Sequence, residues 1–260
     1  MHSAAKTSRG DVDYDRTGRG YSAFRRPDPR IAAQIAHALG NAASVINVGA
    51  GAGSYEPSGR WVVPVEPSAT MRAQRPRALA PAVRAWAEDL PFDDGAFDAA
   101  MAILTLHQWA DKPRGVRELR RVTRGPIVLM VFDPDEFRRF WLMDYAPELG
   151  EADRLRMGTI PELRELLAPV SSSIEIQEVP IPIDCTDGFT EAYYARPERF
   201  LEPEVRAAQS VWNFVAPGTA ERFVARLSDD LASGAWDARY GAWRTRPEFV
   251  GALRIVIARA

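Results

Sequence analysis

The chain has 260 residues, of which 46% are hydrophobic and 26% are charged, and its formal net charge is −2. This composition is typical of a globular protein with one large α/β domain, and the charge gives no indication of a nucleic-acid or membrane partner. The opening MHSAAKTSRG lacks the apolar segment of a signal peptide, and the apolar run 127–132 is too short to span a bilayer. The single cysteine, Cys185, excludes an internal disulfide and a cysteine-based metal site. We therefore expect a cytoplasmic protein.

The first half of the chain is predicted to alternate between strands and helices. Residues 1–30 are polar and rich in arginine, and Asp28 and Pro29 begin a predicted helix over 30–39 that Gly40 ends. Apolar runs then alternate with helical patterns, which indicates a parallel, doubly wound sheet. The predicted strands cover 45–48, 61–65, 83–85, 97–104 and 127–132.

Two details of this first half restrict the prediction. Only residues 49–60 connect the first two strands, so a helix in this connection has a turn or two at most. Pro64 lies inside the second strand, where it removes a hydrogen-bond donor. We therefore expect a bulge or weak pairing at that position.

The second half of the chain has a different pattern, because the alternation stops after Asp133. Residues 135–168 and 187–250 are predicted to be mostly helical, and 174–183 and 252–258 are predicted strands. We therefore predict a mostly parallel, seven-stranded Rossmann-like α/β sheet with helical insertions over its carboxyl edge, where α/β folds bind ligands.

The most informative motif is a glycine loop after the first strand. Gly49, Gly51 and Gly53 let the backbone approach a ligand closely, and Glu66, after the second strand, can accept hydrogen bonds from ribose hydroxyls. The dinucleotide fingerprint places its third glycine where Ser54 stands, and it needs a longer helix than the short connection allows. The pattern thus argues against a nicotinamide-dependent dehydrogenase and favours an adenosine ligand without phosphates.

Four ordered motifs resemble those of class I S-adenosylmethionine (SAM) dependent methyltransferases of the type 11 family. They are the glycine loop with its following acid, Ala-Glu-Asp-Leu-Pro-Phe at 87–92 with Phe-Asp at 97–98, Leu-Thr-Leu-His-Gln-Trp at 104–109, and Arg-Glu-Leu-Arg-Arg-Val at 117–122. The resemblance is strong over residues 20–132 and weak in the last strand. It implies a class I methyltransferase fold and methyl transfer from SAM to O, N or C of a small-molecule acceptor, with S-adenosylhomocysteine as product.

The resemblance also implies roles for segments and residues. Residues 1–30 would form a lid with an arginine on the SAM carboxylate, 31–133 the SAM-binding core, and 134–260 the acceptor pocket with the last strands. The glycine loop would wrap the methionine part of SAM, and later residues would hold the ribose, the adenine and the sulfonium in turn. The implied cofactor-binding residues are Tyr14, Tyr21, Arg25, Arg26, Gly49, Ala50, Gly51, Gly53, Glu66, Pro67, Met71, Ala87, Glu88, Leu104 and Thr105.

Several alternatives stay open at this point. His107 is the candidate general base if the acceptor needs one, but packing is as good an explanation for it. The arginines before residue 30 could form a solvated arm, and the aromatic residues of the insertions could be core or could line the acceptor pocket. We expect no metal, since neither His107 nor the pair Asp93 and Asp94 forms a ligand set. A SAM-binding protein that does not methylate is the alternative function, and the sequence predicts neither the acceptor nor the oligomeric state.

Overall fold

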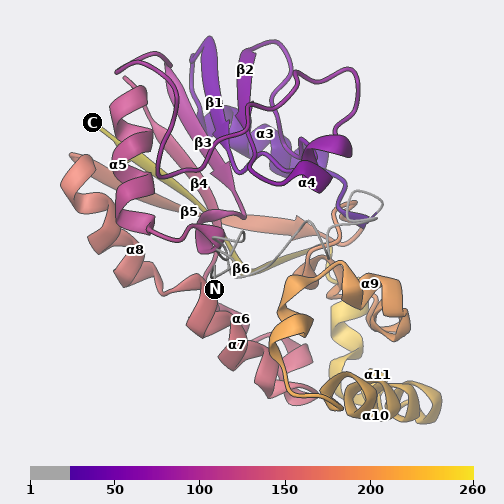
Figure 1. The fold of residues 1–260 in the computed structure, drawn as a ribbon. Coiled ribbons are helices and arrows are strands. Elements are labelled where there is room, and N and C mark those ends of the chain that lie inside the picture. The colour runs from indigo at the N-terminus through magenta and orange to yellow at the C-terminus, as the bar shows by residue number, and fades with distance from the viewer. Residues whose placement is uncertain (1–23) are drawn as a thin grey trace, which may run out of the picture.

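Residues 24–260 of the chain are described by the structure, a computed structural model, and their centre is a mixed β-sheet (Figure 1). Its strands are β1 (Ser44–Val48), β2 (Trp61–Val65), β3 (Ala99–Ile103), β4 (Ile127–Phe132), β5 (Ser173–Pro182) and β6 (Glu248–Arg259). They lie in the order β2-β1-β3-β4-β6-β5, with β1 to β4 parallel to one another and β6 antiparallel to both β4 and β5. The predicted α/β class is confirmed. The predicted number of seven strands is wrong, because the sheet has six among these residues.

The missing strand is the one predicted at 83–85, which is reduced to a single bridge between Val65 and Val83. The Val83 amide donates to the Pro64 carbonyl at 2.9 Å, so the proline nitrogen, which carries no hydrogen, faces the same side. Together with Pro81 just before the bridge, this stops the ladder from growing. The sequence predicts a bulge or weak pairing at Pro64. The bulge is absent, because β1 and β2 pair in regular register from Ser44 opposite Trp61 onward, but pairing is weak on the other side of β2, where the bridge to Val83 stands alone.

Among the described residues, the first half of the chain has three α-helices. They are α3 (Pro29–Ala38), α4 (Ala69–Ala73) and α5 (Lys112–Val122). As predicted, Asp28 caps α3, where its side chain accepts the Arg30 amide at 2.9 Å. The connection 49–60 contains turns and no helix, within the limit expected from its length.

The insertions are helical, as predicted, and lie at the carboxyl end of the parallel strands and beside the sheet. Figure 1 shows α9, α10 and α11 grouped beyond the lower end of the sheet, with α6 and α7 leading towards them. The α-helices are α6 (Pro134–Phe137), α7 (Pro147–Met157), α8 (Ile160–Leu167), α9 (Pro203–Ala207), α10 (Thr219–Ser233) and α11 (Ala235–Tyr240). The 3-10 helices are η1 (Leu106–Gln108), η2 (Trp141–Asp144), η3 (Ala168–Val170), η4 (Thr190–Tyr193), η5 (Pro197–Leu201), η6 (Ser210–Phe214) and η7 (Gly241–Thr245).

The core continues from the sheet into the insertions. On one face of the sheet, α5 and α8 pack on the strands, and on the other face α3 and the remaining insertions do so. Most aromatic side chains of the insertions are buried against one another, and Phe140, Tyr194 and Trp236 are among the fully buried ones. The reading of these residues as core therefore holds for most of them. Within residues 24–260, no helix is both long and apolar enough to cross a bilayer.

Candidate functional site

The glycine loop joins the carboxyl ends of β1, β2 and β3. The Val65 carbonyl at the end of β2 accepts the amides of Gly49 and Ala50 at 2.9 and 3.0 Å. Gly49, Gly51 and Gly53 all have positive φ, at +75°, +50° and +97°. A Cβ on Gly49 would lie 2.1 Å from Oγ1 of Thr105, just after β3. The close approach predicted for this loop is thus present, and one of its neighbours is Thr105.

Glu66 lies at the end of β2, with its carboxylate turned towards the glycine loop. It is 7% exposed, and its two oxygens accept the amides of Gly51 and Ser68, both at 2.8 Å. Burial raises the pKa of Glu66, while these two amides and the charges of Arg72 and Arg75 act in the opposite direction. A carboxylate has about four acceptor positions, so two accepted bonds leave capacity for a pair of hydroxyl groups.

A buried ion pair between Arg75 and Glu56 stabilises the region of the glycine loop, and sequence reasoning missed it. Arg75 donates to Glu56 at 2.9 Å, and both side chains are almost completely buried. Asn47 of β1 also donates to Glu56, at 3.1 Å. Arg72 donates to the carbonyls of Glu66 and Pro67 at 2.8 and 2.7 Å, which fixes the turn after β2. Their signal in the sequence is an acid directly after the loop and arginines in and after the helix that follows β2.

The residues predicted for the adenine end come from two segments, one that follows β2 and one that precedes β3. Met71 is buried in α4, and its methyl group would lie 3.3 Å from a Cβ on Gly51. Ala87 and Glu88 are buried too. One oxygen of Glu88 accepts the Asp111 amide at 3.0 Å, so Glu88 also holds the turn before α5. This contact gives Glu88 a structural role, and its contact with the cofactor stays a prediction.

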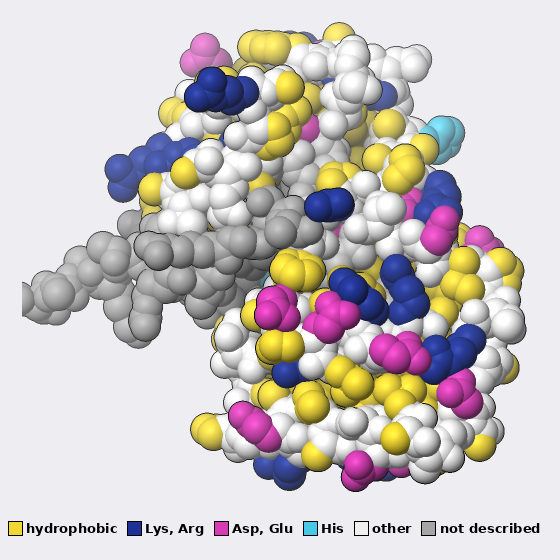
Figure 2. Space-filling view, turned by 90° about the vertical axis from the view of Figure 1, so that its right-hand side faces the viewer, with side chains coloured by type: hydrophobic (Ala, Val, Ile, Leu, Met, Phe, Trp, Pro, Cys, Tyr) yellow, Lys and Arg dark blue, Asp and Glu magenta, His cyan; other side chains and the backbone are white. Residues whose placement is uncertain are grey.

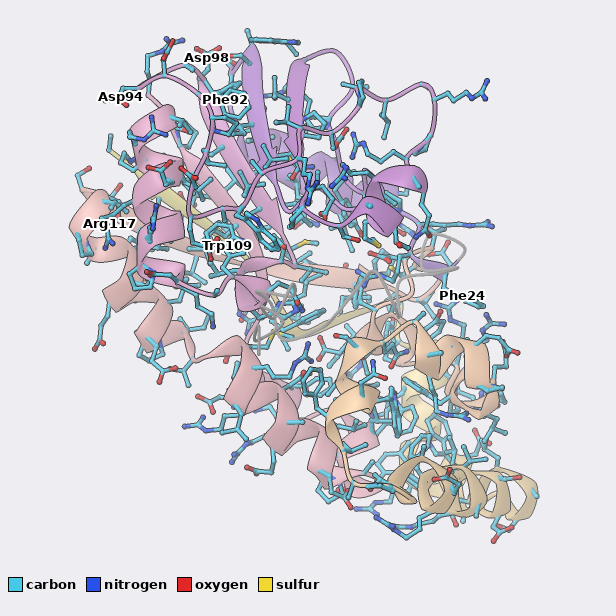
Figure 3. All side chains as sticks on the ribbon, viewed as in Figure 1. Phe24, Phe92, Asp94, Asp98, Trp109 and Arg117 are labelled. Atoms are coloured by element: carbon cyan, nitrogen blue, oxygen red, sulfur yellow. The ribbon has the colours of Figure 1, made fainter. Side chains whose placement is uncertain are left out.

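Helix α5 fastens two of the motifs to each other. Arg121 donates to the carbonyls of Leu90 and Phe92 at 2.9 and 2.7 Å, and Glu118 accepts the Leu90 amide at 3.0 Å. Asp98, from the same motif region, instead accepts the Ser44 amide at the amino end of the sheet, far from Trp109 at the carboxyl end (Figure 3). The motif 87–92 is therefore held in place by the motif 117–122.

The end of β3 carries a strained residue, and a half-buried histidine follows it. Leu104 has a φ of +53°, which is uncommon for a residue with a Cβ, and its amide donates to Met130 of β4 at 2.8 Å. His107 follows in η1, and its Nε2 atom is buried without a hydrogen-bond partner in the described part of the chain. Burial, and then the charges of Arg156, Lys112 and Arg25, lower the pKa of His107 to about 3.

A cavity of about 270 Å³ lies beside this histidine. It is enclosed by the ends of β3 and β4, by the start of α5 and by α8, and its wall is mainly apolar. Its lining includes Leu104, Thr105, His107, Lys112, Phe132 and Ile160. The aromatic residues at 140, 141, 145, 193, 194 and 212 are not part of the lining. The expectation that this set of aromatic residues lines a pocket is therefore not supported for this cavity.

The residues predicted for the lid are placed only in part. Tyr14 and Tyr21 lie outside the described residues. Arg26 is exposed. Arg25 forms an ion pair with Asp187, with Nε 2.7 Å from Oδ1, and its charge is among those that lower the pKa of His107. Sequence reasoning missed Asp187, which lies far along the chain in the loop after β5.

Among residues 24–260, no group of three or more His, Cys, Asp or Glu side chains lies close enough together to hold a metal ion.

A comparison with protein families finds a match to a family model described as a methyltransferase domain, over residues 46–126. A demethylmenaquinone methyltransferase of Mycolicibacterium gilvum is 40% identical over 77 residues, which are 29% of this chain and 34% of the relative. The chain thus spans about a third of the length of that relative.

Two solved structures extend the comparison to almost the whole chain. A proposed methyltransferase from an antibiotic biosynthesis pathway of Anabaena variabilis has a TM-score of 0.84 and 32% identity, and the match covers 91% of this chain and 99% of the other. A SAM-dependent methyltransferase of Thermotoga maritima has a TM-score of 0.56 and 15% identity, with 95% and 97% covered. At that identity the second likeness concerns the fold alone.

Proposed function

Because the chain belongs to the class I SAM-dependent methyltransferases, we propose that it transfers the methyl group of SAM to a small-molecule acceptor held in the cavity beside His107. One observation carries this proposal: Thr105 lies at both the glycine loop and the cavity. Thr105 is the residue against which Gly49 of the glycine loop packs, and it also lines the cavity. A methyl group held by the loop and an acceptor in the cavity would therefore meet at the end of β3.

The residues of the loop fit SAM. Backbone at positive φ without side chains suits a ligand that approaches closely, and the buried carboxylate of Glu66 suits the two ribose hydroxyls. Met71, next to Gly51, suits the adenine. The other residues implied by the family motifs keep their proposed roles, including Arg25 at the carboxylate of SAM.

In this proposal the cavity binds and orients the acceptor and does not activate it chemically. SAM supplies a methyl group that its sulfonium already activates, so the protein has to hold the acceptor in line and exclude water. The apolar wall of the cavity suits an apolar body, and the uncharged imidazole of His107 suits one hydrogen bond to a polar group of the acceptor. Since α8 forms part of the wall, the region 134–260 contributes to the acceptor pocket in this proposal.

The partner proposed here is a small molecule and not a nucleic acid. The face in Figure 2 carries basic and acidic side chains interspersed over the helical insertions. A nucleic-acid surface needs a continuous basic area, which this mixed pattern does not provide on that face.

The binding half of the proposal is tested with Glu66→Gln. The amide keeps the shape of the carboxylate but loses its charge, and hydrogen bonds to charged groups are the stronger ones. We expect the affinity for S-adenosylhomocysteine, measured by calorimetry, to fall by about tenfold to a hundredfold. The exposed Glu165→Gln should bind as the wild type does.

A second ligand tests whether Glu66 contacts the ribose or only stabilises the glycine loop. The 2′-deoxy analogue of S-adenosylhomocysteine lacks one partner of Glu66, so the variant should lose less affinity for it than for the parent compound. Equal losses for both ligands would contradict the ribose assignment.

Methyl transfer itself is tested by incubation of the wild type with methyl-labelled SAM and a cell extract. Tight binding with no label in any metabolite would point to the alternative, a SAM-binding protein that does not methylate.

A further inference from the structure

Three segments far apart in the sequence meet at one buried carboxylate, that of Asp187 in the loop after β5. Asp187 is 2% exposed, and its Oδ1 accepts Arg25 Nε at 2.7 Å and the amide of Gly188 at 2.7 Å. Its Oδ2 accepts the Tyr55 hydroxyl at 2.8 Å. Arg25 precedes α3, and Tyr55 stands two residues after the glycine loop ends at Gly53. The carboxylate therefore links the start of the described chain, the cofactor loop and the second half of the molecule.

Tyr55 has a backbone that its own side chain disfavours. Its φ is +64°, in the left-handed region that a residue with a Cβ rarely adopts. Such a conformation persists only where the surroundings impose it. The ring of Tyr55 is buried, and burial together with Asp187 raises the pKa of its hydroxyl well above the usual range. The hydroxyl is thus a permanent donor, and its bond to Asp187 helps to fix the turn that ends the loop.

The loop after β5 also lies directly on the segment before α3. A Cβ on Gly188 would lie 2.3 Å from the carbonyl oxygen of Phe24, so the two backbones touch. The Thr186 amide donates to Asp28, the cap of α3, at 3.2 Å. Figure 3 labels Phe24 on the side of the sheet that faces the insertions. Residues 24–28 are therefore placed by the second half of the chain.

We propose that Asp187 is a positioning residue of the cofactor site, which fixes the turn at Tyr55 and, beside it, Arg25. The inference rests on the proposed SAM site and adds that a loop outside the four motifs determines how well SAM binds. Asp187 acts through its neighbours. Arg25 balances its charge, so an amide at this position would keep the shape but remove the partner of a largely buried guanidinium.

The test is a double-mutant cycle in the affinity for S-adenosylhomocysteine, with Asp187→Asn, Tyr55→Phe and the double variant. Each single variant should bind about tenfold more weakly, because Tyr55→Phe removes the donor of this bond and Asp187→Asn leaves at most a weaker, uncharged bond in its place. The double variant should lose no more than about twofold in affinity beyond the single variant that binds more weakly, since both changes act on the same charge-assisted bond. Asp184→Asn is the matched control, because Asp184 lies in the same loop, is 73% exposed and pairs with Arg30. It should bind as the wild type does.

Steady-state kinetics separate positioning from loss of folded protein. Asp187→Asn should raise KM for SAM by about tenfold while kcat changes less than about threefold, whereas a smaller folded fraction would lower kcat alone. Additive losses in the cycle, or wild-type affinity in Tyr55→Phe, would overturn the inference. Tyr55→Phe keeps the test decisive even if Asp187→Asn does not fold. A wild type that does not bind S-adenosylhomocysteine at all would instead refute the proposed function.

Discussion

His107 stands at the end of β3 as an uncharged imidazole. Burial and the nearby charges of Arg156, Lys112 and Arg25 hold its pKa at about 3, so the imidazole is uncharged near neutral pH. A base with such a pKa removes a proton poorly from an acceptor, but its nitrogen atoms can still orient one. In the proposed function, His107 therefore aligns the acceptor and does not serve as its general base.

The low pKa of His107 predicts a pH dependence of stability. The unfolded histidine titrates near pH 6.5, so between pH 6.5 and 3 the unfolded chain binds a proton that the folded protein does not. The stability that this group contributes is present above pH 6.5 and is lost as the pH falls towards 3. His107→Gln should therefore lose about 1–2 kcal/mol less free energy of unfolding than the wild type between pH 7 and 5.

Urea unfolding at the two pH values checks this prediction. The exposed His37→Gln serves as control and should follow the wild type. An acid sensitivity of His107→Gln equal to that of the wild type would show that His107 is not buried in its neutral form.

At the scale of elements, the site depends on how closely the turn after β1 approaches the turn after β3. Gly49 has a φ of +75°. Leu104 has a φ of +53°, and it directly precedes Thr105, the residue that Gly49 approaches. Two adjacent turns thus adopt left-handed backbone where the cofactor loop and the cavity meet. Strain of this kind persists where the surrounding structure imposes it, and it is common at functional sites.

The close approach predicts the effect of Gly49→Ala. The new Cβ would lie 2.1 Å from Thr105 Oγ1, so one of the two turns has to move. We expect the free energy of unfolding to fall by about 2–4 kcal/mol and the affinity for S-adenosylhomocysteine to fall with it. Chemical denaturation and calorimetry measure the two effects.

Gly59→Ala is the matched control for this change. Gly59 lies in the same connection with a φ of +76°, but a Cβ there meets nothing within 4 Å. It should therefore show only the backbone cost of about 1 kcal/mol, with normal cofactor affinity. Equal losses in the two variants would mean that the contact with Thr105 is unimportant.

Helix α5 shows how one element serves two motifs. A Cβ on Gly115 would lie 2.5 Å from the ring of Trp109, so the glycine lets the tryptophan of the third motif pack on the helix. One turn and a half further along, Arg121 holds the carbonyls of Leu90 and Phe92. These motifs are separate in the sequence, but α5 joins them to one another.

At the scale of the molecule, a buried acid joins the insertions to the sheet. Glu191 of η4 is fully buried, and its two oxygens lie 3.0 and 2.9 Å from the amide of Ala252 in β6. Gly251 beside it leaves no space for a side chain, since a Cβ there would lie 2.3 Å from Glu191. Burial raises the pKa of Glu191 to about 8. The folded protein therefore holds this carboxyl group protonated at neutral pH.

The raised pKa predicts that stability falls as the pH rises. The unfolded glutamate titrates near pH 4.5, so between pH 4.5 and 8 the folded protein holds a proton that the unfolded chain has lost. Its contribution is complete below pH 4.5 and is lost as the pH rises through 8. Glu191→Gln cannot titrate, so relative to its own value at pH 5 it should retain roughly 2–4 kcal/mol more free energy of unfolding at pH 8 than the wild type does.

Denaturant unfolding across this pH range measures the difference. Glu165→Gln, on the exposed side of α8, should keep the slope of the wild type. A wild type whose stability does not fall between pH 5 and 8 would contradict the assignment.

The sequence by itself determined the features that neighbouring residues specify. The strands at 45–48, 61–65 and 127–132, the cap of the first helix and the glycine loop depend on local patterns of apolar, turn-forming and capping residues. The methyltransferase family followed from the order and spacing of four short motifs, and the comparisons confirm it. Glu66 could be placed at the loop for the same reason, because the ends of adjacent parallel strands lie at one edge of a sheet.

Only the tertiary structure decided which distant side chains meet. The contact of Asp187 with Arg25 and Tyr55 and the burial of Glu191 against β6 join residues that are tens to more than a hundred positions apart. The loss of the strand at 83–85 likewise depended on which side of β2 the Pro64 nitrogen faces. Such contacts follow from how whole elements dock, and no local pattern of residues records that docking.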